Sequence, residues 1–143
     1  MSSARFEYTH RVGYAECTVG NHIYYARYLD LLDRARGEFF RGLGAPLQQW
    51  QDQDTIFPVI ESHVRYKSPA RYDDLLSIEA WVTAAHGVRL NFAYRLTKGP
   101  GTLIAEAETL HVCTGLSEKP KRLPAGLVAL LQPYLAARET GAA

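Results

Sequence analysis

One long amphipathic helix, followed by four strands in a row, is the feature that most limits how this chain can fold. Apolar residues recur at three- and four-residue steps over residues 25–43, while charged residues fall on the opposite side. This spacing predicts a helix of about five turns. The glycines and proline of residues 42–46 then end it. Such a helix needs a broad apolar surface to cover one side.

Strand-like segments supply that surface. One precedes the helix and four follow it, with apolar and polar residues alternating over much of their length. Because short turns such as KGPG join the later strands, we expect an α+β domain in which five antiparallel strands cover the helix. The predicted strands are residues 6–16, 57–68, 75–84, 88–97 and 102–114.

The remaining segments predict smaller features. Residues 47–55 read as a polar connection with a short helical turn, and a second, short helix opens near Pro124. Gly37 lies inside the long helix, where glycine costs about 1 kcal/mol relative to alanine. We therefore expect a packed neighbour close to its backbone. Residues 140–143 form a frayed tail.

The composition is typical of one globular domain. The chain has 143 residues, of which 47% are hydrophobic and 22% charged, so we predict a single domain over residues 1–143. Its formal net charge of +1 gives no sign of a nucleic-acid or membrane surface, and it is compatible with a local basic cluster for phosphates. No apolar run approaches the roughly 20 residues that span a bilayer, and no apolar leader begins the chain. We therefore expect a cytoplasmic protein.

The cysteines and histidines show no metal-ligand spacing. Cys17 and Cys113 are far apart and form no C-x-x-C motif, and the five histidines are scattered. Cys17 adjoins the strand-to-helix join but has no histidine partner in the sequence, so we interpret it as a buried thiol. We expect no metal and no separate cofactor.

Two motifs occur together and in order. GYAECTVGNHIYYARYLDLLDRAR covers residues 13–36, and VRYKSPARYDDLLSIEAWV covers residues 64–82. Both resemble the 4-hydroxybenzoyl-CoA thioesterase-like branch of the hotdog-fold thioesterases. The resemblance implies a hotdog fold, with a five-stranded antiparallel sheet wrapped around one long central helix. It also implies homodimers or homotetramers with active sites at the dimer interface.

The same resemblance implies a reaction. Members of this branch hydrolyse acyl thioesters of coenzyme A or of an acyl carrier protein to a free acid and a thiol. In the family, an amide at the start of the long helix polarises the thioester carbonyl, and the matching amide here is that of Tyr25. Thr18 replaces the family's usual aspartate in the preceding turn. A threonine hydroxyl is neutral and cannot act as a general base unaided.

Three candidates for the missing base remain open. Glu16 lies two residues before Thr18, is predicted to share its strand face, and is also a candidate for contacting the substrate. Glu61 is an acid in a strand otherwise rich in apolar residues, and a buried carboxylate there would suit base chemistry. His22 lies at the helix start, where the dipole favours the neutral imidazole.

A further arrangement positions water without a base. Hotdog thioesterases that act on carrier-protein polyketide intermediates, including the enediyne type, resemble this chain in lacking the acid at the turn. They use an asparagine there and an arginine in the helix. Thr18 and Arg36 occupy the matching positions, and Asn21 is a nearby amide that would orient the same water.

Cationic and aromatic residues predict substrate contacts. The resemblance assigns the carrier's phosphates to the region of His86 and Arg89, and Lys67 and Arg71 flank the turn of the second motif. Aromatic residues near the presumed pocket, among them Tyr24, favour an apolar acyl group.

Two other functions compete with hydrolysis. The missing aspartate motivates a protein that binds acyl thioesters without hydrolysing them. A dehydratase on the same fold is disfavoured, because the expected histidine context is not evident. Release of free thiol from acyl-CoA substrates distinguishes a hydrolase from a binding protein.

Overall fold

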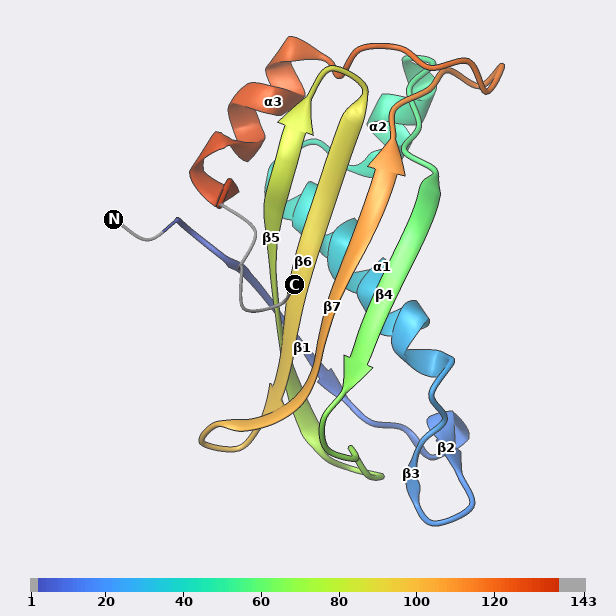
Figure 1. Ribbon diagram of the computed structural model, residues 1–143, viewed down its shortest axis with the longest axis vertical. Coiled ribbons are helices and arrows are strands. Elements are labelled where there is room, and N and C mark those ends of the chain that lie inside the picture. Colours follow the sequence, from blue (N-terminus) through green and yellow to red (C-terminus); the bar gives the residue numbers. More distant parts are fainter. Residues whose placement is uncertain (1–2, 137–143) are drawn as a thin grey trace.

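Five antiparallel strands form one sheet, and the long helix α1 lies across one of its faces (Figure 1). The computed structural model describes residues 3–136. The strand order β1-β5-β6-β7-β4 leaves β1 and β4 as the two edges. This is the α+β hotdog arrangement that the sequence predicts. The strands are β1 Phe6–Arg11, β4 Val59–Tyr66, β5 Leu75–His86, β6 Arg89–Lys98 and β7 Thr102–Val112.

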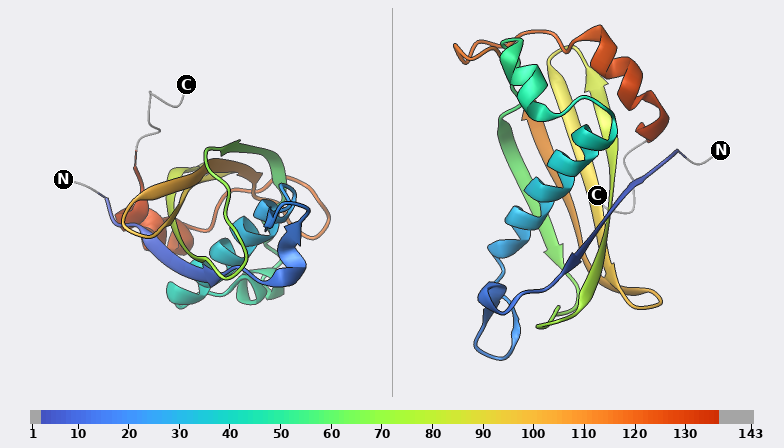
Figure 2. Two further views of the ribbon diagram at one scale, coloured as in Figure 1. Left: turned by 90° about the horizontal axis from the view of Figure 1, so that it is seen from below. Right: turned by 180° about the vertical axis from the view of Figure 1, so that it is seen from behind.

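Helix α1, Arg27–Gly42, packs its apolar side against the sheet (Figure 2). It begins two residues after the predicted start at Tyr25, and Gly44 follows it in the left-handed conformation, with φ +78. The expected close neighbour of Gly37 is wrong, because a Cβ there would meet no described atom within 4 Å beyond its own helix. The buried side chains of α1 are Tyr28, Leu31, Leu32, Ala35, Phe39 and Phe40.

The N-terminal strand is shorter than predicted. It ends at Arg11, and the chain then forms a single 3-10 turn and a small hairpin before α1. Tyr14 and Glu16, which the prediction placed in this strand, instead lie in the 3-10 turn, so Glu16 does not share a strand face with Thr18, and Tyr14 is exposed. The three elements are η1 Tyr14–Glu16, β2 Cys17–Thr18 and β3 His22–Ile23.

The short helices α2 and α3 lie at the same end of the molecule, the upper end in Figure 1. The predicted turn after α1 is helix α2, Leu47–Asp52, and the predicted helix after Pro124 is α3, Ala125–Leu131, followed by η2, Gln132–Tyr134. The predicted tail, residues 140–143, lies outside the described residues. No helix within residues 3–136 is long and apolar enough to cross a membrane.

Polar side chains interrupt the core between α1 and the sheet. Tyr94 on β6 and Thr109 and His111 on β7 are buried there. The Tyr94 hydroxyl lies 2.7 Å from Thr109 Oγ1, which lies 2.8 Å from His111 Nε2. His111 Nδ1 is in turn 2.9 Å from the Phe57 carbonyl oxygen. Each of these three side chains therefore has hydrogen-bond partners despite its burial.

Burial lowers the pKa of His111 to about 4. The bond to the Phe57 carbonyl opposes this shift, and the positive charge of Arg36 adds to it. An unfolded chain binds the proton near the ordinary value of about 6.5. Between those two values the unfolded state holds more protons than the native state, so stability falls as pH falls through that window.

We therefore expect acid to destabilise the wild type more than the non-titrating variant His111→Gln. This histidine alone removes about 3 kcal/mol from the free energy of unfolding as pH falls from about 7 to about 4. Urea unfolding of both proteins at several pH values measures the difference. Equal pH dependence in the two proteins would contradict the assignment to His111.

Candidate functional site

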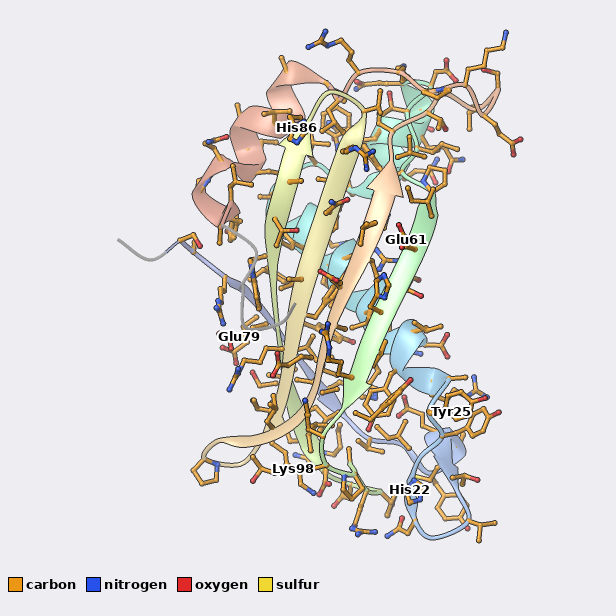
Figure 3. The ribbon with its side chains drawn as sticks, in the orientation of Figure 1. His22, Tyr25, Glu61, Glu79, His86 and Lys98 are labelled. Carbon is orange, nitrogen blue, oxygen red and sulfur yellow. The ribbon has the colours of Figure 1, made fainter. Side chains whose placement is uncertain are left out.

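An open cleft of about 530 Å³ lies at the N-terminal end of α1. Its walls come from the β2–β3 hairpin, from the turn that leads into α1, and from the segment that follows β4. Figure 3 shows His22 and Tyr25 close together at this end of the molecule. The predicted site residues that line the cleft are Thr18, His22, Tyr24, Tyr25 and Lys67.

The start of α1 leaves two backbone amides unpaired. Ala26 is the N-cap residue, and no side chain caps the helix. Among the described residues, the N–H groups of Tyr25 and Ala26 reach no acceptor, whereas the Tyr24 amide donates to the Glu16 carbonyl at 2.9 Å. Unpaired amides at the positive end of a helix dipole can receive negative charge that develops on an oxygen.

Thr18 and His22 face each other across the hairpin. They are a directly opposed pair in β2 and β3, so their Cβ atoms are roughly 5 Å apart. His22 Nδ1 lies 3.4 Å from the Ile23 carbonyl oxygen. Because a carbonyl only accepts, Nδ1 carries the hydrogen in the neutral ring and Nε2 keeps a free lone pair. A hydroxyl and an imidazole base are thus neighbours in the cleft.

Four tyrosines make one wall of the cleft. The ring centroids of Tyr24 and Tyr25 are 4.8 Å apart, and those of Tyr28 and Tyr66 are 5.2 Å apart. The Tyr66 hydroxyl also donates to the Tyr25 carbonyl at 3.1 Å. Burial raises the pKa values of Tyr28 and Tyr66, so both phenols stay neutral at pH 7. Sequence reasoning missed Tyr66, because alternation alone does not show which strand end meets a helix start.

Glu16 does not line the cleft. Its carboxylate accepts the Nε2–H of His10 at 2.8 Å and the amide of Gly13 at 2.7 Å. His10 lies in β1, and Gly13 lies between β1 and η1. Glu16 therefore fixes the turn that leads into the hairpin, and its lone pairs are largely occupied.

Asn21 and Arg71 hold the hairpin from outside. The Asn21 side-chain oxygen accepts the amide of Tyr72 at 3.3 Å, and Arg71 donates to the Gly20 carbonyl at 3.2 Å. Asn21 itself has a φ of +59, in the left-handed region that asparagine tolerates. These contacts tie the hairpin turn to the loop before β5.

Arg36 lines a second, separate cavity of about 200 Å³. It lies nine residues after Arg27, roughly 14 Å along the helix axis. Asp33, Phe57 and His111 share the cavity wall with it. Within one chain, Arg36 therefore does not meet the cleft at the start of α1.

Three other predicted residues lie away from the cleft. Glu61 lies near the start of β4, away from the end of the strand that is beside Tyr25. His86 is at the opposite end of the sheet from His22 (Figure 3). His86 pairs with Arg89 at the turn between β5 and β6. The expected burial of Glu61 is wrong for the single chain, because 56% of its side chain is exposed, and its carboxylate lies 3.3 Å from His63 Nε2.

The described residues offer no metal-binding cluster. Within residues 3–136, no three His, Cys, Asp or Glu side chains come together as possible ligands. Cys17 and Cys113 are both free thiols. Burial raises the pKa of the Cys113 thiol, so it remains protonated at neutral pH.

Comparison with known proteins identifies the family. The sequence matches the thioesterase-like superfamily over residues 12–131, from the end of β1 to the end of α3. The acyl-CoA thioester hydrolase YbgC of Escherichia coli O157:H7 is 35% identical over 90% of this chain and 97% of its own. The acyl-CoA thioesterase YbgC of Haemophilus influenzae is 34% identical, over 83% and 88%.

A solved structure has a similar fold. The crystal structure of the hypothetical protein TT1821 from Thermus thermophilus superimposes with a TM-score of 0.83 at 26% identity, over 93% of this chain and 99% of that one. The family match covers the cleft, α1 and strands β4 to β7, and the two relatives cover most of the chain. The chain belongs to the thioesterase-like superfamily.

Proposed function

We propose that this protein hydrolyses acyl-CoA thioesters to a carboxylic acid and free coenzyme A. The names of its relatives in Escherichia coli and Haemophilus influenzae support this reaction. The observation that carries the proposal is the uncapped start of α1, with two free amides beside a cleft that also holds a hydroxyl and an imidazole. Membership of the 4-hydroxybenzoyl-CoA thioesterase-like branch is part of the proposal.

The free amides receive the thioester carbonyl oxygen. Tyr25 N–H is the principal donor, as in the family, and Ala26 N–H is adjacent. In the tetrahedral transition state the carbonyl oxygen becomes negative, and preorganised amides stabilise that charge without reorganising. This differential stabilisation lowers the barrier to attack on the carbonyl carbon.

His22 takes the role of the missing aspartate. Its Nε2 removes a proton from a water that the Thr18 hydroxyl holds, and the water oxygen attacks the carbonyl carbon. Collapse of the tetrahedral intermediate breaks the C–S bond. The His22 imidazolium then gives the proton that it took from water to the departing thiolate, so the products are the acid and the thiol. Glu16, occupied by His10 and Gly13, does not compete for this role.

The coenzyme A moiety lies along the cleft entrance. Lys67 lines the cleft and forms no ion pair with a described residue, so its ammonium group is available for a phosphate. The tyrosine wall gives the pantetheine arm and an apolar acyl group a surface to pack against. An acyl carrier protein would present the same phosphopantetheine arm as a substrate.

A second subunit completes the site. Edge strand β4 exposes apolar side chains, including Ile60 at 53%, and pairing two β4 strands about a twofold axis covers them. Antiparallel pairing sets the start of one β4 beside the end of its partner. The Arg36 cavity, lined by Phe57 just before β4, then faces the partner's cleft at its Tyr66 end. Arg36 thus acts in the partner's site.

Wild-type protein should release free thiol from at least one acyl-CoA in a panel of aryl, short-chain and long-chain thioesters. A thiol-reactive chromophore follows the release. Binding of these thioesters without turnover would contradict hydrolysis and favour the non-hydrolytic binding protein that the missing aspartate suggests. Turnover of acyl carrier protein but not of acyl-CoA would overturn the assignment of the carrier.

His22→Gln should lower kcat by about 100-fold or more, the usual contribution of a general base. Thr18→Val should cost less, since the hydroxyl only orients the water. The matched control is Glu61→Gln, which should stay within about threefold of wild type. Full activity of His22→Gln, or a severe loss in Glu61→Gln, would show that the base has been assigned to the wrong residue.

Ile60→Lys should dissociate the dimer and lower activity together, because it places a charge at the proposed strand pairing. Leu116→Lys is the control, since Leu116 is similarly exposed, at 57%, but lies outside β4. Light scattering after gel filtration gives the mass of each variant. A monomeric wild type with full activity would rule out a site shared between subunits.

A further inference from the structure

A chain of hydrogen bonds links Arg36 to the interior of the sheet. Arg36 Nη1 donates to the Tyr94 hydroxyl oxygen at 3.1 Å. From there the contacts run through Thr109 and His111 to the Phe57 carbonyl, each at 2.9 Å or less. The chain crosses three elements, α1, β6 and β7, and ends on the segment before β4.

The two ends of this chain fix the direction of every bond in it. The Phe57 carbonyl only accepts, so His111 Nδ1 carries the hydrogen, and the neutral ring leaves Nε2 as an acceptor. Thr109 must then donate to Nε2 and accept from the Tyr94 hydroxyl. Arg36 only donates, so the Tyr94 oxygen accepts from it while its hydrogen points to Thr109. The buried side chains of Tyr94, Thr109 and His111 are all satisfied in one arrangement.

This arrangement holds the guanidinium of Arg36 at the cavity. Only 12% of its side chain is exposed, and its one carboxylate partner, Asp33 at 2.9 Å, is 75% exposed and therefore screened by water. The Tyr94 hydroxyl is the buried anchor on the other side. Arg36 has five N–H donors, and these two bonds leave three for another acceptor.

We infer that Tyr94, Thr109 and His111 are positioning residues for the hydrolysis, acting through Arg36. They fix the guanidinium so that its remaining N–H groups meet an oxygen atom of the acyl thioester in the cavity. The inference rests on the proposed function, and it adds a role for three core residues that the sequence motifs do not include. Their shared site of action is Arg36, so their effects should disappear when Arg36 is absent.

Apolar side chains could replace this chain of hydrogen bonds in the core. Phenylalanine, valine and leucine in place of Tyr94, Thr109 and His111 would fill similar space and leave no buried donor to satisfy. The polar chain instead ends at a charged side chain on a cavity wall. Such an end is expected of a group held for a ligand rather than of a purely structural network.

The test is a double-mutant cycle between Tyr94→Phe and Arg36→Gln. Tyr94→Phe removes one hydroxyl, keeps the ring, and should lower kcat/KM by about tenfold, as expected for loss of a hydrogen bond to a charged group. In the Arg36→Gln background the same change should cost less than about twofold. Equal losses in both backgrounds would mean a structural role only, and would overturn the inference.

Two controls and a second readout keep the outcome interpretable. Tyr134→Phe removes a hydroxyl from another tyrosine, which is partly buried and packs on Phe39, and should leave kcat/KM unchanged. Thr109→Val replaces Tyr94→Phe if that variant does not fold. The same cycle on the Kd of phenacyl-CoA, a thioether that cannot be hydrolysed, applies even if no acyl-CoA is turned over. Normal turnover in Arg36→Gln would overturn the inference while leaving hydrolysis intact.

Discussion

Burial of α1 against the sheet determines where chemistry can occur in this protein. The helix presents six buried side chains to the sheet, and this packing fixes its axis and sets its first turn beside the end of β4, where Tyr28 meets Tyr66 (Figure 1). Among the described residues, the N–H groups of Tyr25 and Ala26, just before that turn, remain without acceptors. In a capping box, a Glu or Gln side chain three residues after the N-cap residue accepts from the N-cap amide and stabilises the helix start, but Leu29 stands at that position here. The start of α1 therefore lacks this stabilisation, but it keeps free N–H donors beside the cleft.

The residues around the cleft divide into those that face it and those that hold it in place. Glu16 joins the turn to His10, while Arg71 and the backbone of Tyr72 hold the hairpin at Gly20 and Asn21. A hairpin with only two residues in each strand is too short to be stable alone. These outside contacts are therefore needed to keep Thr18 and His22 opposed. The cleft is built on a loop, yet its geometry depends on rigid neighbours.

The sequence predicts the large elements well, because hydrophobic period is a local property. The alternation in β5 and β6 and the helical spacing of α1 are visible without any tertiary information. The hairpin was not predicted, since η1 and two-residue strands are too short to show a period. The orientation of Glu16 depends on His10, six residues away, and the exposure of Glu61 depends on which strand is at the sheet edge. Both are consequences of tertiary packing that no local pattern contains.

The buried chain of hydrogen bonds also depends on tertiary packing that local sequence patterns do not contain. Tyr94 lies within the predicted strand of residues 88–97 and is buried, but alternation does not reveal that its hydroxyl meets Thr109 on β7 and Arg36 on α1. A signal was nonetheless available: Thr109 and His111 are two residues apart in a predicted strand, so they share a face, and polar residues on a core-facing strand require partners. A basic residue at a core-facing helix position is the natural partner for such a pair. Reading polar residues at buried positions together, rather than each as an exception, would have located this network from the sequence.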